Sequence, residues 1–139
     1  MTTLIEVKDL VKHFPIGGSR LVVQAVNDVS FRIAEGRTLG LVGESGSGKT
    51  TVGRCILRLI EPTAGTVQFK GQDIGQMSHS AFRRLRPQMQ MVFQDPYDSL
   101  DPHMTTAEII GEPLALWSRL RRARMRERIH DLASKVGLQ

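Results

Sequence analysis

The segment Gly43–Thr50 limits what this chain can fold into more than any other. It reads G-E-S-G-S-G-K-T and fits the pattern G-x-x-x-x-G-K-[S/T] at every fixed position. Its glycines allow backbone angles and close approaches that a Cβ atom would block. Backbone N–H groups can then surround an oxyanion, and the N-terminus of a following helix adds donors and a favourable dipole. The segment therefore predicts a phosphate-binding loop that leads from a strand into a helix.

Each residue type in this loop suits one part of a magnesium-bound triphosphate. The ammonium group of Lys49 can reach the β- and γ-phosphates and offset charge during phosphoryl transfer. The Thr50 hydroxyl can bind Mg²⁺, and Thr51 can reach the α-phosphate. The remaining expected contacts come from Gly43, Glu44, Ser45, Gly46, Ser47 and Gly48. We expect a site for ATP, or another purine nucleoside triphosphate, together with Mg²⁺; the alternative is a glycine-rich turn that binds nothing.

The residues around the loop predict a mixed α/β organisation. Thr38–Val42 is apolar almost throughout, which favours a strand buried on both faces of a parallel sheet, and Met89–Phe93 is a second such candidate. Alternation over Val29–Ile33 indicates a strand with one buried face. Further strands are expected at Leu4–Val7, Leu21–Val26 and Thr66–Phe69, with a turn over Pro15–Ser19. Helices are expected over Lys49–Leu59 and from an N-cap at Ser78 to Leu85. From Thr105 onward the chain is expected to be helical, first at Ala107–Ile110 and then over 115–136.

The charge distribution argues against nucleic acid as a partner. Residues 119–139 hold seven Lys or Arg and two Asp or Glu, which accounts for the whole formal net charge of +5. Residues 1–118 are therefore balanced, unlike a surface built for a polyanion. The arginines at 119–128 favour a solvated helix face, with contact to a membrane subunit or anionic lipid as the alternative. Cys55, the single cysteine, is expected to be a small core residue.

A second group of residues narrows the class of phosphate-loop protein. Two β-rich segments precede the loop, and Met91-Val92-Phe93-Gln94-Asp95-Pro96 follows it. Together these resemble the ATP-binding subunit of an ATP-binding-cassette (ABC) transporter. The stretches Gly40–Arg54, Phe93–Pro102 and Glu108–Leu114 resemble the oligopeptide/dipeptide importer branch; related branches carry peptides, glutathione or nickel.

The resemblance implies roles for two residues outside the loop. Phe14 fits the aromatic residue that stacks on adenine, although it could instead be a core aromatic. Gln94 fits the glutamine that contacts Mg²⁺ and the attacking water and couples to the membrane partner, although it could be a solvated loop residue. Tyr97 could face the membrane subunit or simply pack within its own domain.

The resemblance also implies a domain organisation. It predicts an ABC-type nucleotide-binding domain whose β subdomain and phosphate-loop core occupy residues 1–104, with a helical subdomain beginning over 105–139. Residues 1–139 contain no L-S-G-G-Q signature, no second apolar strand ending in Asp-Glu and no switch histidine. We therefore expect the chain to be the N-terminal portion of a longer protein that contains further parallel strands.

By resemblance, the full-length protein would hydrolyse ATP to drive import of peptides or similar small solutes. The implied partners are transmembrane permease subunits, a second ATP-binding subunit and, indirectly, a solute-binding protein. The implied location is the cytoplasmic face of the inner membrane, as a peripheral subunit. Two alternatives remain open: a nucleotide-binding remnant without turnover, and a soluble ABC ATPase that acts in DNA repair or translation.

Overall fold

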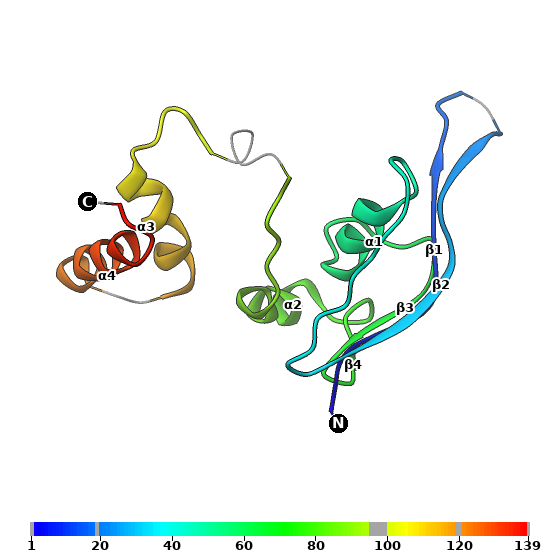
Figure 1. Ribbon diagram of the computed structural model, residues 1–139, viewed down its shortest axis with the longest axis horizontal. Coiled ribbons are helices and arrows are strands. Elements are labelled where there is room, and N and C mark those ends of the chain that lie inside the picture. The colour runs from blue at the N-terminus through cyan, green and yellow to red at the C-terminus, as the bar shows by residue number, and fades with distance from the viewer. Residues whose placement is uncertain (1, 19, 95–99, 119–120, 139) are drawn as a thin grey trace. The chain divides into compact units, whose positions relative to one another are not determined.

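The computed structural model describes residues 2–18, 20–94, 100–118 and 121–138, which form two compact units, Met1–Gln90 and Met91–Gln139. The first unit contains four strands and two α-helices, and the second contains an α-helical pair (Figure 1). The strands are β1 (Thr3–Pro15), β2 (Val22–Ala34), β3 (Ala64–Phe69) and β4 (Gln72–Asp73). The helices are α1 (Lys49–Ile56), α2 (His79–Leu85) with a 3-10 turn at Arg86–Gln88, α3 (Thr106–Trp117) and α4 (Arg122–Lys135).

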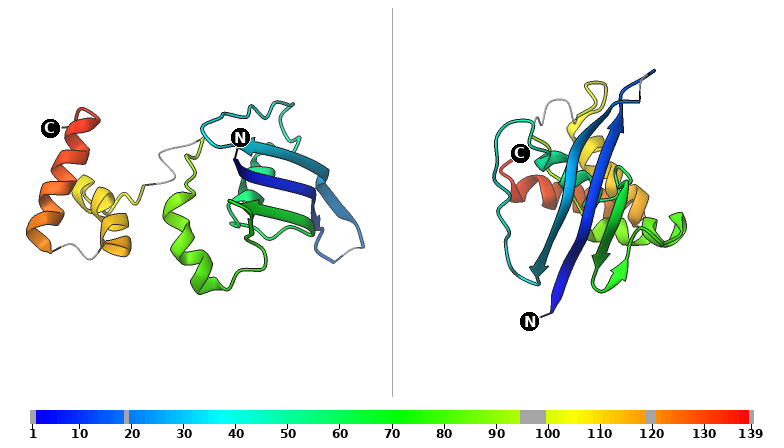
Figure 2. Two further views of the ribbon diagram at one scale, coloured as in Figure 1. Left: turned by 90° about the horizontal axis from the view of Figure 1, so that it is seen from below. Right: turned by 90° about the vertical axis from the view of Figure 1, so that its right-hand side faces the viewer.

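The four strands form one antiparallel sheet in the order β2-β1-β3-β4. β1 and β2 are joined by a turn at the predicted position after Pro15 and make a long hairpin (Figure 2). The sequence predicted short separate strands at Leu4–Val7, Leu21–Val26 and Val29–Ile33. The structure instead makes each arm of the hairpin one continuous strand, and the prediction of short separate strands was wrong in extent.

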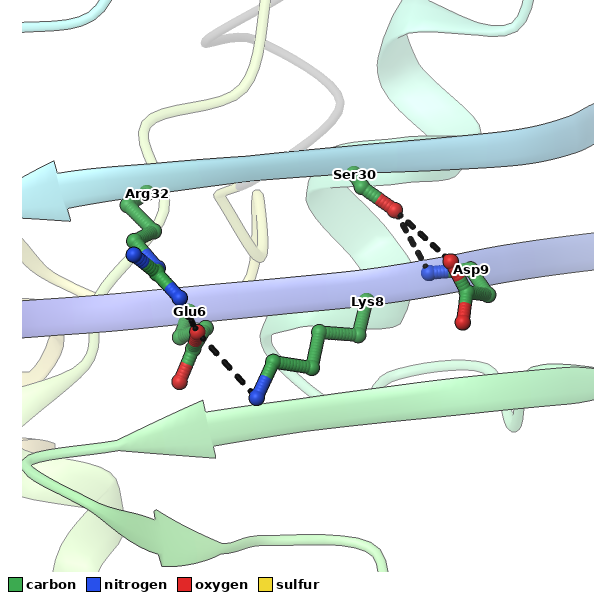
Figure 3. Close-up of polar contacts among 5 residues, drawn as sticks. All are labelled: Glu6, Lys8, Asp9, Ser30 and Arg32. Carbon is green, nitrogen blue, oxygen red and sulfur yellow. Dashed lines mark hydrogen bonds and ion pairs between the residues drawn. The ribbon is translucent and has the colours of Figure 1, made fainter.

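Bulges in both arms explain why the strands run longer than their sequence pattern indicates. Asp9 and Asp28 adopt positive φ angles of 50° and 53°, and the β1–β2 register shifts between Val7 and Leu10. A bulge inserts one extra residue and resets the alternation of side chains. The Ser30 hydroxyl accepts a hydrogen bond from the Asp9 backbone N–H at 2.8 Å and donates one to Asp9 Oδ1 at 3.1 Å (Figure 3). The bulge therefore leaves this backbone donor satisfied.

One face of the sheet carries the hydrophobic core, and α1 and α2 both pack against it (Figures 1 and 2). The sheet contributes buried Val, Leu and Phe side chains, and each helix adds an apolar face. Cys55 lies in this core with 1% of its surface exposed, as predicted, and burial raises the pKa of its thiol. The buried residues are Val7, Leu10, Val26, Val52, Cys55, Val67, Phe69, Ile74 and Phe82.

The opposite face of the sheet is polar. The Glu6 carboxylate accepts a hydrogen bond from Arg32 Nε at 2.7 Å, and its ion pair with Lys8 Nζ spans 3.2 Å (Figure 3). The hydrogen bond from Arg32 and, to a smaller extent, the one from Lys8 lower the pKa of Glu6. Unlike charges on neighbouring strands favour the observed pairing, because a shift by one residue would turn them toward the core.

The lowered pKa of Glu6 predicts an acid-dependent loss of stability. A carboxylate whose pKa is lower in the folded state stabilises the fold above its unfolded pKa, about 4.3 for glutamate, and loses that effect as the pH falls through the folded value. Melting temperatures measured from pH 7 to pH 3 should therefore fall less steeply in Glu6→Gln than in the wild type. Glu35→Gln, in the turn after β2, is the control; an identical pH profile for Glu6→Gln and the wild type would contradict the prediction.

Two strands predicted from apolar runs do not form. Thr38–Val42 and Met89–Phe93 are irregular, and Leu39, Leu41, Val42, Val92 and Phe93 expose between 45% and 96% of their surface. A strand needs backbone partners on a neighbouring strand, and within the described ranges neither segment has such a partner. The prediction of buried strands at Thr38–Val42 and Met89–Phe93 was therefore wrong, because it depended on apolar composition alone.

The second unit is a pair of packed helices. α3 begins at a capping box, in which the Thr105 hydroxyl and the Glu108 carboxylate bond to each other's backbone N–H groups. A Cβ added to Gly111 would meet Ile129 Cδ1 of α4 at 3.0 Å, so the helices approach closely at this point. The predicted start of helical structure at Thr105 is confirmed, because Thr105 is the N-cap of α3. The predicted division between Ala107–Ile110 and 115–136 was wrong, because α3 extends through Pro113 and the backbone turns at Ser118.

Most of the predicted helix features in the rest of the chain are confirmed. Ser78 caps α2 by accepting a hydrogen bond from the Ala81 N–H at 3.3 Å, and α1 ends three residues before the predicted Leu59.

The arginines of the basic cluster that the structure describes are exposed, and Arg119 lies outside the described residues. Within the ranges that the structure describes, no helix has both the length and the apolar character needed to cross a membrane.

Candidate phosphate-binding site

The glycine-rich loop ends at the N-terminus of α1. Gly48 occupies the N-cap position in a left-handed conformation, with φ 89°, and the first backbone bond of the helix runs from Val52 N–H to the Gly48 carbonyl. The backbone N–H groups that come before the first bonded one at a helix N-terminus have no acceptor within the helix. The first turn, Lys49 to Val52, contains no acidic side chain, so this turn itself supplies no negative charge to the positive end of the helix dipole.

The side chain of Lys49 folds back across the loop. Its Nζ donates hydrogen bonds to the carbonyl oxygens of Gly43 at 2.8 Å and Glu44 at 2.5 Å, and to Ser47 Oγ at 3.3 Å. These acceptors are neutral and the group carries a full positive charge. Charge-assisted hydrogen bonds to an anion are stronger than those to neutral acceptors, so the ammonium group is available for a phosphate oxygen.

Close packing against β2 fixes the position of the loop. A Cβ on Gly48 would lie 2.0 Å from the carbonyl oxygen of Ala25, and a Cβ on Gly43 would lie 2.7 Å from Ser47 Oγ. Lys12 pairs with Val26 and His13 pairs with Gln24, so Ala25 is the extra residue of a bulge in β2. The loop therefore needs glycine at position 48 because β2 backbone occupies the space that a side chain would fill.

Loop and strand together line a pocket of about 220 Å³. The loop side contains predicted site residues, and the strand side contains three residues that the sequence analysis did not single out. No spacing in the sequence identifies these three, because their place depends on the β2 bulge. The pocket is lined by Val23, Gln24, Ala25, Gly46, Ser47, Gly48, Lys49, Thr50 and Thr51.

The predicted residues outside the loop fall in different parts of the structure. Phe14 lies on β1 directly opposite Val23, a pocket-lining residue, and exposes 38% of its surface. Gln94 belongs to the second unit, where it is exposed and outside any helix or strand. Tyr97 lies outside the described residues. The roles of Phe14 and Gln94 stay predictions.

The loop, the helix that follows it and the antiparallel sheet beside it define an α/β phosphate-loop domain of the ABC nucleotide-binding type. This class agrees with the fold predicted from the sequence. The chain belongs to the ABC transporter family, whose model matches residues 26–139.

Curated relatives place the chain near peptide transport proteins. It is 46% identical to a probable peptide ABC transporter ATP-binding protein, y4tS, of Sinorhizobium fredii, over 97% of this chain and 40% of the relative. It is 48% identical to the oligopeptide transport ATP-binding protein OppF of Bacillus subtilis, over 97% of this chain and 44% of the relative. The chain thus spans less than half the length of these relatives.

Solved structures confirm the fold. The dimeric structure of MJ0796, a bacterial ABC transporter cassette, superposes with a TM-score of 0.81 at 25% identity and covers 98% of this chain and 58% of the cassette. A dimeric post-hydrolysis structure of MJ0796 bound to ADP and Pi gives the same TM-score at 24% identity and shows the likeness of fold alone.

Proposed function

We propose that this chain forms the ATP-binding part of an energy-coupling subunit, which in the complete protein hydrolyses ATP to drive import of peptides or similar small solutes. The observation that carries the proposal is the conformation of the phosphate-binding loop. The N-terminus of α1, the glycine at position 48 that close packing on β2 requires and the Lys49 side chain held across the loop meet at one pocket. These are the donors that a triphosphate requires.

The proposed mechanism assigns the loop residues to binding and charge stabilisation. Lys49 exchanges its carbonyl partners for β- and γ-phosphate oxygens, while the N–H groups from Ser45 to Thr51 surround the phosphates. The donor set also fits magnesium, because Thr50 lies in the first turn of α1 and offers the hard oxygen ligand that this ion prefers. Magnesium would supply further neutralisation of the phosphate charge.

Two residues outside the loop complete the proposed site. Phe14 would stack on adenine, and its place opposite Val23 supports this role because opposed side chains of an antiparallel pair share a face. Gln94 would contact Mg²⁺ and position the attacking water, and it would link the site to a membrane partner. In the proposed organisation, residues 1–104 hold the β subdomain and phosphate-loop core, and 105–139 begin the helical subdomain.

The proposed partners follow from the family. Transmembrane permease subunits and a second ATP-binding subunit would assemble with the complete protein, and a solute-binding protein would deliver the solute. The location would be the cytoplasmic face of the inner membrane. The names of the peptide-transport relatives support the solute class, and the balanced charge of residues 1–118 supports a partner other than nucleic acid.

Calorimetric titration of the chain with Mg-ATP tests the proposal. We expect saturable binding of Mg-ATP. We expect no such binding in either of two control titrations, one in which EDTA removes magnesium and one in which adenosine replaces ATP. Phosphate release measured on the same sample separates a hydrolysing domain from one that only binds. Pull-down from membranes with permease subunits, compared with capture on DNA, tests the import role; failure to bind Mg-ATP would contradict the proposal as a whole.

A further inference from the structure

A second cation lies close to the candidate nucleotide site. The Nζ of Lys12 is 5.0 Å from the centre of the Phe14 ring, within the range of a cation–π interaction. The same Nζ donates a hydrogen bond of 2.7 Å to the carbonyl oxygen of Glu61, which follows α1. The ammonium group is therefore held between an aromatic ring and a backbone carbonyl.

The strand geometry explains why these two side chains meet. Lys12 and Phe14 are two residues apart on β1 and lie on the same face of the sheet. Lys12 pairs with Val26, a core residue that is 4% exposed, so this is the face covered by α1. Phe14 pairs with Val23, which lines the phosphate pocket. The bulge at Ala25 keeps Val23 and Val26 on one face, although three positions separate them.

We propose that Lys12 is a positioning residue for the nucleotide base: it holds the Phe14 ring by one face and leaves the other face to stack on adenine. This inference rests on the proposed function, in which Phe14 contacts the base. Phe14 is 38% exposed, so its ring would otherwise be free to sample several orientations. A fixed cation restricts that freedom before binding, which lowers the entropic cost of ordering the ring in the complex.

The charge also favours stacking directly. An ammonium group over one face of a ring draws π electron density toward itself and leaves the opposite face less negative. Adenine is rich in π electrons, so it stacks better on the less negative face. Lys12 acts only through Phe14 in this account, and its effect should be confined to ligands that carry a base.

The test uses calorimetry on the whole chain with two ligands, Mg-ATP and Mg-tripolyphosphate. We expect Lys12→Met, which keeps the aliphatic stem, to weaken Mg-ATP by about three- to fivefold and to leave Mg-tripolyphosphate unchanged. Lys12→Arg should restore most of the ATP affinity because it keeps the cation. Lys12→Gln repeats the neutral substitution in case one variant fails to fold.

The control is a matched pair elsewhere in the same unit. Lys70 Nζ lies 5.2 Å from the centre of the Phe69 ring and donates a hydrogen bond to Gln88 Oε1 at 2.9 Å, and none of these three residues lines the pocket. Lys70→Met loses the same kind of interaction and should bind both ligands as the wild type does. In a Phe14→Leu background, Lys12→Met should have no further effect on ATP, because coupled residues are not additive.

The outcomes separate this inference from the function on which it rests. Equal ATP affinity in Lys12→Met and the wild type would overturn the positioning role while leaving ATP binding intact. Equal weakening of both ligands would also overturn it, since that result indicates a structural role. A wild-type chain that binds tripolyphosphate and ATP equally would show that no base contact exists, and a wild type that binds neither would refute the phosphate site itself.

Discussion

Replacing Lys49 with alanine is expected to weaken Mg-ATP binding by about a hundredfold or more while the fold stays intact. The substitution removes the only ammonium group among the residues that line the pocket. It also removes the proposed charge-assisted hydrogen bonds to the β- and γ-phosphates, which are worth about 1.5–3 kcal/mol each. Among the described residues, Lys49 Nζ forms hydrogen bonds to loop atoms alone, so the core behind α1 keeps its contacts. Calorimetry measures the affinity, and circular dichroism checks the fold.

Two controls sharpen this prediction. Lys8→Ala removes a lysine from the polar outer face of the sheet and should bind Mg-ATP as the wild type does. Lys49→Arg keeps the charge but brings a larger planar group that does not fit the same acceptors, so it should remain impaired. Wild-type affinity in Lys49→Ala would remove the basis for assigning phosphate binding to this loop.

Gly48→Ala is expected to be the most damaging single-methyl substitution in the loop. Alanine at φ 89° is strained, and its Cβ would lie 2.0 Å from the Ala25 carbonyl oxygen. Backbone strain and overpacking each cost about 1–3 kcal/mol, so we expect a loss of about 2–6 kcal/mol or a displaced loop. The melting temperature and the affinity for Mg-ATP should therefore fall together.

Gly46→Ala is the matched control for Gly48. Gly46 also has a positive φ, 80°, but a Cβ there would meet nothing within 4 Å. This variant carries the strain of the backbone without the clash, and its melting temperature should lie between those of the wild type and Gly48→Ala. Equal melting temperatures for the two variants would mean that the contact with β2 does not constrain the loop.

The loop could be predicted from the sequence because its chemistry is local. The glycine spacing and the lysine of Gly43–Thr50 lie within eight consecutive residues, and the helix that follows was predicted from apolar spacing in α1. The cap at Ser78 was predictable for the same reason, because its hydrogen bond reaches only to Ala81. Phe14 and Gln94 came instead from resemblance to a family.

The parts that could not be predicted depend on pairing between distant residues. The wall of the pocket at Val23–Ala25 exists because a bulge in β2 turns one carbonyl toward Gly48, and no local pattern marks that bulge. The long β1 strand was missed because Asp9 interrupts the alternation on which strand prediction depends. The strand predicted at Thr38–Val42 does not form, because an apolar composition favours a strand but hydrogen bonding to a neighbouring strand decides whether it forms.

The aspartate bulges have a consequence at the far end of the hairpin. Side chains alternate between the two faces of a sheet along a strand. Each residue inserted by a bulge therefore moves every later side chain of that strand to the opposite face. The orientation of Lys12 and Phe14 is thus inherited from Asp9, several residues closer to the N-terminus, where the Ser30 hydroxyl holds the extra residue in place. The contact between Asp9 and Ser30 on the polar face therefore helps to decide that the Phe14 ring lies on the core face of the sheet. Removing or adding one residue in β1 before Lys12 would turn Lys12 and Phe14 to the opposite face.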